Sequence, residues 1–264
     1  MKYYDKINNR LVFVQKQASQ NFWENHWAKH NVEKLIKNAS SSRVILCNTR
    51  KYLRVGARIL EGGCGPGQYV NCLHVNGYES YGLDYATETL KSIHQIKPEL
   101  RVLSGDVNAL PFKNSFFDGY WSFGVIEHFY NGYNGIALEM KRVLKRGGYL
   151  FLAVPVMSWL RRKKAIKGKY LNYNETIDAK EEFYQFALDP KRVIKEFEEK
   201  NFILKRTVKV DGVKGLKGEI SLFKRPLQWI YDCQILPVKI IRKIIDILAK
   251  PFANHVMLFI FKSQ

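Results

Sequence analysis

A glycine-rich turn at residues 59–67 constrains the fold of this chain more than any other feature. An apolar run ends in Glu61, three alternating glycines follow, and an apolar stretch resumes at Tyr69. The three glycines are Gly63, Gly65 and Gly67. Glycine reaches positive φ without strain and lets a ligand approach bare main chain, and a helix start exposes free N–H groups. The segment therefore predicts a buried strand, a tight turn and a helix, with a ligand at the turn.

The charge around the turn indicates which kind of ligand fits it. A dinucleotide-binding turn would carry a third glycine or alanine where this chain has Gln68, and its helix end would face pyrophosphate. Glu61 instead places a carboxylate beside the turn. A carboxylate repels phosphate and attracts a cation, so the motif favours a cationic ligand. From this motif alone, an ordinary glycine-rich turn without a ligand is the alternative.

Further apolar segments end at acids or at glycine pairs, as the strands of a parallel sheet do. Asp84 ends the first of them, 23 residues after Glu61, where such sheets place the carboxylate that binds ribose hydroxyls. A lone Asp at this position is also common as a helix N-cap. We predict strands at 80–84, 101–105, 116–123 and 148–155, and a helix at 136–144 that stops at Gly147-Gly148.

The order of these segments resembles the motif series of the class I, Rossmann-like S-adenosylmethionine-dependent methyltransferases. The series is the glycine turn, Gly-Leu-Asp, Gly-Asp-Val-Asn, Phe-Asp-Gly-Tyr-Trp-Ser and Leu-Lys-Arg-Gly-Gly, within residues 57–155. Glu61 stands where the family more often has Asp. The resemblance implies an α/β fold with a doubly wound, seven-stranded, mainly parallel sheet of order 3-2-1-4-5-7-6. The last strand would be antiparallel, with an N-terminal helical cap and C-terminal helical insertions.

The resemblance also implies a role for individual residues around S-adenosylmethionine, whose product is S-adenosylhomocysteine. Asp84 would bind the ribose hydroxyls, and Asp106 would accept from the adenine amino group. Tyr85 and Val107 would flank the adenine, and the backbone oxygen of Phe123 would lie near the ammonium group. The residues expected around the methionine part are Glu61, Gly62, Gly63, Gly65 and Gly67.

Glu127 and His128 are the candidate catalytic pair. They follow the fourth predicted strand, where the loop overhangs the methyl group in similar enzymes. Histidine titrates near neutral pH and suits removal of a proton from an acceptor hydroxyl. The alternative is that His128 orients the loop without touching the acceptor.

The flanking segments are expected to decorate this core, which spans 57–155. Residues 1–56 should form a helical cap, whose Trp23 and Trp27 either close over the cofactor or simply pack together. Residues 156–264 should complete the sheet through 190–210 and 255–262. Between them we expect a basic lid at 156–185 and an amphipathic helical insertion at 211–254.

The net charge of +19 lies entirely outside the core. Lys and Arg balance Asp and Glu at 9 each in residues 57–155, whereas they outnumber them by 11 to 3 in residues 1–56 and by 23 to 12 in residues 156–264. Two basic segments, 159–169 and 226–250, also carry Trp or Ile at helical spacing. Such segments either pack on their own protein or contact an anionic membrane surface, and the sequence leaves both open.

Composition bounds the remaining possibilities. The four cysteines have no paired metal spacing, so we expect reduced thiols and no bound metal. The chain starts without an apolar core of signal-peptide length and has no run of about 18 apolar residues. We therefore expect a cytoplasmic protein, peripheral at the inner membrane face if the basic segments bind lipid. Nothing indicates its oligomeric state.

The expected function is methyl transfer to a small-molecule, lipid-linked or glycan acceptor, at an oxygen. An RNA-directed methyltransferase would also use the basic surface, although no RNA-recognition motif is visible. Gln68 and Glu61 argue against a nicotinamide-dependent oxidoreductase. A non-catalytic relative that binds S-adenosylmethionine is a further alternative.

Overall fold

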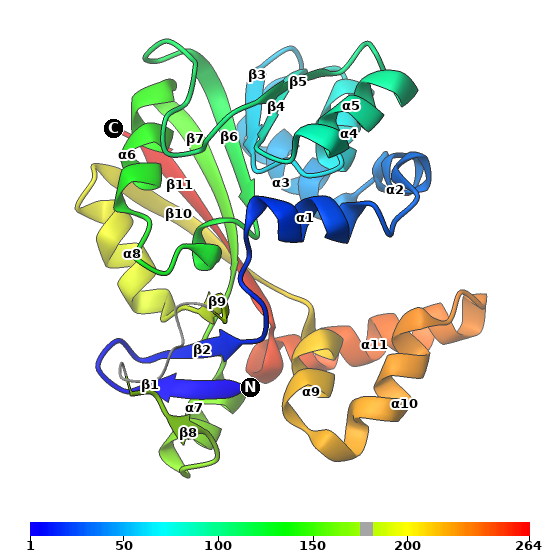
Figure 1. Cartoon of the computed structure of the whole chain (residues 1–264), viewed down its shortest axis with the longest axis vertical. Helices are drawn as coiled ribbons and strands as arrows, with labels where there is room; N and C mark the ends of the chain where they lie inside the picture. The colour runs from blue at the N-terminus through cyan, green and yellow to red at the C-terminus, as the bar shows by residue number, and fades with distance from the viewer. Residues whose placement is uncertain (175–181) are drawn as a thin grey trace.

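A seven-stranded sheet forms the centre of the molecule in the computed structural model, which describes residues 1–174 and 182–264 (Figure 1). Its strands are β3 (Arg58–Gly62), β4 (Glu79–Asp84), β5 (Arg101–Ser104), β6 (Phe117–Phe123), β7 (Leu144–Pro155), β10 (Phe202–Val210) and β11 (Val256–Ser263). Their order is β5-β4-β3-β6-β7-β11-β10, and β11 is antiparallel to both neighbours. This confirms the predicted fold class, including the 3-2-1-4-5-7-6 order and the antiparallel last strand.

Helices cover both faces of this sheet. On one face, α3 and α4 contribute Ile45 and Leu73 to a cluster with Trp121 and Phe151 of the central strands. On the other face, α6 and α8 contribute residues such as Met140 to the largest apolar cluster. The helices of the core are α3 (Arg43–Tyr52), α4 (Gln68–His74), α5 (Thr87–Ile96), the short 3₁₀ helix η1 (Ile126–His128), α6 (Asn134–Val143) and α8 (Pro190–Glu198). Burial on both faces explains why the central strands are near-continuous apolar runs.

The N-terminal segment departs from the prediction of a helical cap over residues 1–56. It begins with a hairpin of β1 (Lys2–Asp5) and β2 (Arg10–Val14), and the helices α1 (Gln20–Trp27) and α2 (Val32–Ala39) follow. The turn explains the difference, because the Asp5 carboxylate accepts from the Asn8 amide and pairs with Arg10, while Asn9 adopts φ 47°. Asx side chains and positive φ favour a turn over helix continuation.

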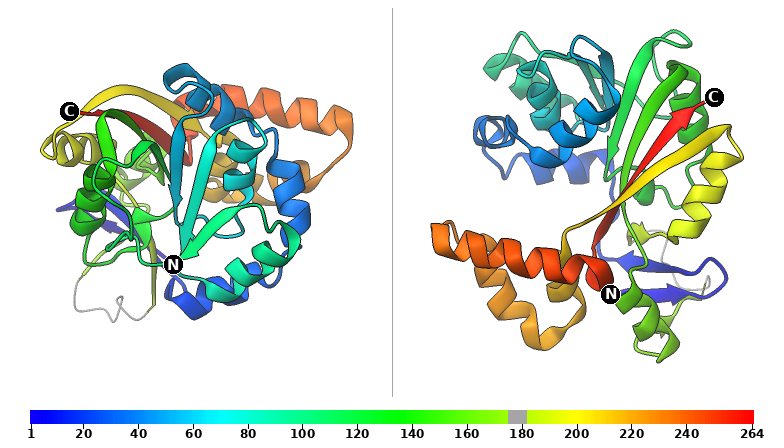
Figure 2. Two further views of the ribbon diagram at one scale, coloured as in Figure 1. Left: turned by 90° about the horizontal axis from the view of Figure 1, so that it is seen from above. Right: turned by 180° about the vertical axis from the view of Figure 1, so that it is seen from behind.

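The segment predicted as a basic lid at 156–185 also contains strands. After α7 (Trp159–Ile166), β8 (Leu171–Asn172) and β9 (Phe183–Ala187) join the hairpin in a second sheet of order β8-β1-β2-β9. Residues 175–181 of the expected lid lie outside the described part of the chain. The second sheet lies beyond the carboxyl ends of the central strands, next to α1 (Figures 1 and 2).

The segment 211–254 consists of three helices between β10 and β11. They are α9 (Gly212–Glu219), α10 (Ser221–Asp232) and α11 (Leu236–Ala253). Gly215 allows α9 to cross α11 closely, since a Cβ there would lie 1.5 Å from the Ala253 carbonyl oxygen. We call α10 and α11 together the helical arm, because they extend to one side of the molecule (orange in Figures 1 and 2). No helix in the described residues is long and apolar enough to cross a membrane.

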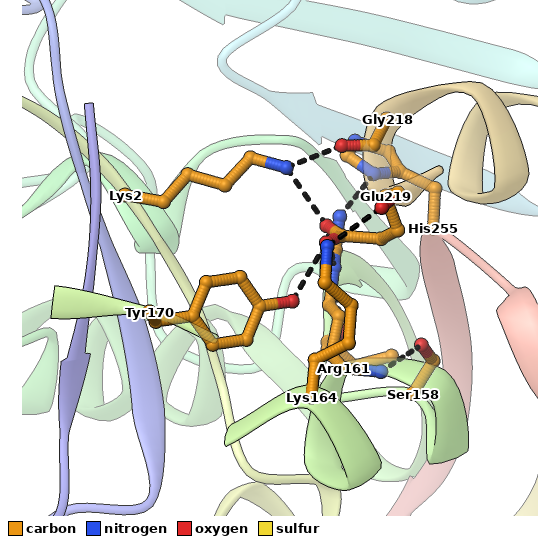
Figure 3. A network of polar contacts seen from close by, with 9 residues as sticks. Lys2, Ser158, Arg161, Lys164, Tyr170, Gly218, Glu219 and His255 are labelled. Atoms are coloured by element: carbon orange, nitrogen blue, oxygen red, sulfur yellow. Dashed lines mark hydrogen bonds and ion pairs between the residues drawn. The ribbon is translucent and has the colours of Figure 1, made fainter. Parts of the chain in front are cut away.

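A buried ionic network fixes the base of the arm (Figure 3). The carboxylate of Glu219, at the end of α9, accepts hydrogen bonds from Arg161 Nε at 3.0 Å, Lys2 Nζ at 2.9 Å and Tyr170 Oη at 2.6 Å. Lys164 also pairs with Glu219, at 3.2 Å. Burial opposes ionisation of Glu219, but the cations outweigh it and hold its pKa at about 2. Arg161 is therefore buried and Lys164 half-buried, and both pair with Glu219, so this part of the segment 159–169 packs on its own protein, one of the two alternatives that the sequence left open.

Candidate functional site

A cavity of about 510 Å³ opens at the carboxyl ends of β3, β4 and β6. This is the end of an open α/β sheet where ligands bind. The cavity collects eight of the predicted site residues, namely Gly63, Gly65, Asp84, Tyr85, Asp106, Val107, Phe123 and His128. The predicted residues that do not line it are Glu61, Gly62, Gly67 and Glu127.

The glycine turn presents bare backbone to the cavity. Gly63, Gly65 and Gly67 have φ of 75°, 48° and 68°, the left-handed region that glycine adopts at no steric cost. A Cβ on Gly63 would lie 2.4 Å from Val125, and one on Gly65 would lie 2.8 Å from the Trp27 ring. The turn thus needs glycine both for its conformation and for the close approach of its neighbours.

Asp84 is locked in place at the end of β4. Its side chain accepts from the amide of Gly65 at 2.7 Å and from the amide of Ala86 at 2.9 Å, and the residue is 6% exposed. Burial raises the pKa of Asp84, although these amide hydrogen bonds oppose the shift. A carboxylate has lone pairs beyond those two bonds, so Asp84 can still accept from a ligand in the cavity.

The alternative role of Asp84 as the N-cap of the next helix does not match the geometry. The first turn of α5 is capped by Glu24 of α1, which accepts from the amides of Glu88 and Thr89 at 3.1 and 3.2 Å. A carboxylate at a helix N-terminus is stabilised by the exposed N–H groups and the helix dipole. This contact also fixes α1 beside the cavity.

Glu61 lies beneath the turn rather than in the cavity. It is buried, and its Oε2 has no hydrogen-bond partner among the described residues. Burial raises its pKa well above the usual range, and the nearby Asp84 adds to the shift. A buried carboxyl oxygen without a partner is costly, and a cationic group bound above the turn would offset that cost.

Gly62 and Gly67 pack against other side chains and do not line the cavity. A Cβ on Gly62 would collide with the hydroxyl of Tyr120, and one on Gly67 would lie 3.1 Å from Ile93. Their positions allow the strand and helix to pack closely, and they place no atoms on the cavity wall.

The loop after β5 and the end of β6 form the next part of the wall. Asp106 is exposed and accepts from the backbone and side-chain nitrogens of Asn108 at 2.8 and 3.0 Å, while Val107 is buried behind it. Phe123 ends β6, with its ring 5.3 Å from that of Tyr69. This half of the cavity wall therefore combines a carboxylate from Asp106 with apolar side chains from Val107 and Phe123.

His128 and Glu127 point to different surroundings. The Nδ1 of His128 lies 2.6 Å from the Tyr184 carbonyl oxygen, which can only accept, so Nδ1 carries the proton and Nε2 is left as an acceptor. Burial lowers the pKa of His128 to about 4. Glu127 is buried outside the cavity, its Oε2 has no partner in the described chain, and burial raises its pKa to about 8. Of the predicted pair, only His128 lines the cavity.

Aromatic side chains form the half of the cavity around His128. Trp23 meets His128 edge to face at 5.0 Å and lies 5.9 Å from Trp27. The other aromatic residues of this wall are Phe129, Tyr130 and Phe183. Among the described residues that line the cavity, the charged side chains are those of Asp84 and Asp106, and none is Lys or Arg.

Three contributors to the site escaped the sequence analysis. The Tyr184 carbonyl that fixes the His128 tautomer is a backbone atom and has no sequence signal. Tyr130 and Phe183 meet at 5.2 Å, although they are far apart in the chain. The dense aromatic content of residues 129–133 and 183–186 was the available hint.

Comparisons with known proteins agree with this site. Residues 60–152 match the model of a methyltransferase domain family. Over 125 residues the chain is 26% identical to a malonyl-[acyl-carrier protein] O-methyltransferase from Enterobacter lignolyticus, and this match covers 47% of each protein. The chain thus spans less than half the length of the curated relatives it matches.

Solved structures share the fold over most of the chain. A chain from the complex between the Haloferax volcanii Trm112 methyltransferase activator and a methyltransferase superimposes with a TM-score of 0.59 at 15% identity, covering 91% of this chain and 97% of that one. The [4+2]-cyclase SpnF superimposes with a TM-score of 0.53 at 14% identity, covering 96% and 98%. At 15% and 14% sequence identity, these two superpositions show a shared fold and nothing more. Residues 60–152 thus match a methyltransferase domain, and this match and the sheet order together support a place for the chain in the class I, Rossmann-like methyltransferase family.

Proposed function

We propose that this protein is an S-adenosylmethionine-dependent methyltransferase that acts on a hydroxyl oxygen of a small or lipid-linked acceptor. The observation that carries the proposal is one cavity with two unlike ends. One end has bare glycine backbone and two carboxylates, and the other has aromatic rings around His128. A methyltransferase needs such a pairing, because cofactor and acceptor must meet in one enclosed space.

The residues present fit S-adenosylmethionine. Asp84 offers a fixed carboxylate for a vicinal diol, and Asp106 beside Val107 offers an acceptor and an apolar surface for a purine. The Oε2 atom of Glu61 beneath the turn has no partner among the described residues, which favours a ligand with positive charge over one with phosphates. When bound, the cofactor supplies a methyl group on a sulfonium.

The lining of the other end favours an acceptor that is uncharged where it reacts. A carboxylate or phosphate in this space would meet no Lys or Arg among the described lining residues, and burying an unpaired charge is costly. Aromatic walls suit apolar or ring-shaped acceptors. The same reasoning disfavours RNA in the cavity, despite the basic surface elsewhere.

His128 is the proposed base. With Nδ1–H donated to Tyr184, the Nε2 atom of the neutral ring accepts the proton of the acceptor hydroxyl. The bound cofactor would supply the methyl group, and Nε2 of His128 would hold the proton that the acceptor oxygen loses. A pKa near 4 keeps the ring unprotonated and ready at neutral pH.

The test is transfer of a radiolabelled methyl group from S-adenosylmethionine to fractionated cell extracts. The proposal expects label in a small-molecule or lipid fraction, and its loss with His128→Ala. A matched control, His94→Ala, changes a histidine of α5 that does not line the cavity and should leave transfer intact. Label in RNA or protein alone would overturn the acceptor class, and no transfer to any fraction would overturn the activity.

A further inference from the structure

The helical arm exposes an apolar surface that the rest of the described protein leaves uncovered. On α11, Leu236, Ile240, Ile247 and Leu248 are 70%, 54%, 56% and 67% exposed. On α10, Trp229 is 63% exposed. The other large apolar residues that are exposed on the arm are Leu222, Phe223, Tyr231, Ile235, Ile241, Ile244 and Phe252. So large a group of exposed apolar side chains marks an interaction site.

The packing of α11 explains why this surface faces outward. Its small residues Ala249 and Ala253 are buried against α9, whose Gly212 and Gly215 leave room for them. Helical spacing places residues 236, 240, 244 and 248 on a face away from that contact. The helix therefore packs with its small residues and presents its large apolar residues to the outside, the reverse of a surface helix that covers its own core.

Cations border the apolar face. Residues 221–253 contain six Lys and Arg against two Asp. Lys224, Arg225 and Lys243 are exposed, Lys239 is half-buried, and none of the four has an ion pair or side-chain hydrogen bond within the described chain. Lys239 and Lys243 are three and four residues from Leu236 and Ile247, so they lie at the edge of the apolar face.

We propose that the helical arm docks on an anionic lipid bilayer, with its apolar face in the headgroup region and its cations at the anionic lipids. An interfacial helix needs this combination of a wide apolar face, Trp and bordering Lys or Arg. Protein interfaces, in contrast, are depleted in Lys. A two-fold contact between two copies of the arm would also bring like charges together.

The position of the arm suits this contact. α9 begins just after β10 ends at Val210, so the arm leaves the sheet at the same carboxyl end where the cavity opens. It then extends away from the central sheet (Figures 1 and 2). At 18 residues α11 is about 27 Å long, and it would lie along the interface. The docking requires neither cofactor nor methyl transfer and stands apart from the proposed function.

The test is sedimentation with vesicles of phosphatidylcholine alone or mixed with phosphatidylglycerol, at low and high salt. We expect binding to the anionic vesicles at low salt, weaker binding at high salt, and little binding to phosphatidylcholine. Replacing Lys224, Arg225, Lys239 and Lys243 with Gln should weaken binding at least about tenfold, because the anionic lipids lose these four cationic partners. Replacing Ile240, Ile244 and Leu248 with Ser should abolish it.

The matched control removes the same charge elsewhere. Lys29, Lys34, Lys37 and Arg43 are exposed on the N-terminal helices or just before them, and changing them to Gln should leave vesicle binding nearly unchanged. Circular dichroism checks that each variant is folded. If the control and arm variants lost vesicle binding equally, net charge alone would explain the binding, and the proposal would be overturned. The proposal would also be overturned if ultracentrifugation showed a dimer that is lost in the Ser variant. Binding to RNA rather than to vesicles, or no vesicle binding at all, would overturn it too.

Discussion

Asp84 shows how much of the proposed site depends on single, preorganised side chains. Two backbone amides hold its carboxylate in one orientation, so a ligand does not have to order it on binding. The resemblance to the methyltransferases implied roles for Asp84, Asp106 and His128, and the structure places all three on the cavity wall. Glu127, predicted as the partner of His128, does not line the cavity, because neighbours in a 3₁₀ turn point in different directions.

Replacing Asp84 with Asn should weaken binding of S-adenosylhomocysteine by about 1–3 kcal/mol, because the ribose would lose a charge-assisted acceptor. Calorimetric titration measures the change. Asp118→Asn is the control, since Asp118 pairs with Lys145 away from the cavity. Equal affinities of the Asp84 variant and the wild type would show that this carboxylate does not hold the ligand.

His128→Ala should lower methyl transfer on the order of 10²-fold while cofactor affinity stays within a few-fold. The pH profile separates a base from a structural residue. Since the pKa of His128 is lowered to about 4, the unprotonated form prevails down to about pH 5, and kcat/KM should stay level on the acid side to that point. A fall with a midpoint near the ordinary histidine value of about 6.5 would contradict the buried base.

Glu127→Gln tests a buried carboxyl through stability. Burial raises the pKa of Glu127 in the folded protein to about 8, above the value of about 4.5 in the unfolded chain. Between these two pH values, Glu127 is therefore protonated in the folded state and ionised in the unfolded state. Stability of the wild type should therefore be fully present below that window and fall as pH rises through it, on the order of 5 kcal/mol in total. Urea unfolding at several pH values should show this slope in the wild type but not in the variant. Parallel slopes would place Glu127 in solvent.

Among the elements, α7 and the arm show what a charge run or an amphipathic pattern leaves open. The cations at 161–164 left both packing on the protein and surface contact open, and Arg161 is 1% exposed because Glu219, 58 residues later, lies beside it. The spacing of apolar residues in α11 predicted a helix. The same spacing occurs in a helix that packs on its own core and in one whose apolar face is exposed, so the sequence could not distinguish them. The hairpin β1–β2 was missed because its strands are short and its partner β9 is about 170 residues away.

Glu219→Gln should destabilise the protein by about 3–5 kcal/mol, because Arg161 would remain buried without its counter-charge. Glu199→Gln, which removes an exposed ion pair with Lys195, should cost at most about 1 kcal/mol. Chemical denaturation gives both values. Hydrogen exchange should also rise in α9–α11 of the Glu219 variant, since the network joins these helices to α7 and β1. Similar stabilities of the two variants would mean that the network does not anchor the arm.

For the whole molecule, the predictable part is the middle of the central sheet, where β3, β4 and β6 are largely buried and end at or next to a glycine or an acid. Its order followed from the resemblance and is confirmed. The unpredictable part is what forms between distant segments: the second sheet, the aromatic half of the cavity and the Glu219 network. The neutral core and basic periphery seen in the sequence correspond to this division, with the cavity built mainly on the core and the free cations of the arm outside it.

The central claim is that the cavity at the glycine turn is built for a cationic adenosyl ligand. Calorimetric titration of the purified protein with S-adenosylmethionine, S-adenosylhomocysteine and NAD, side by side, tests it most directly. The account predicts micromolar or tighter binding, a Kd that corresponds to about −8 kcal/mol or better, for the two adenosyl ligands and no binding of NAD. Binding of NAD without a response to either adenosyl ligand would contradict it.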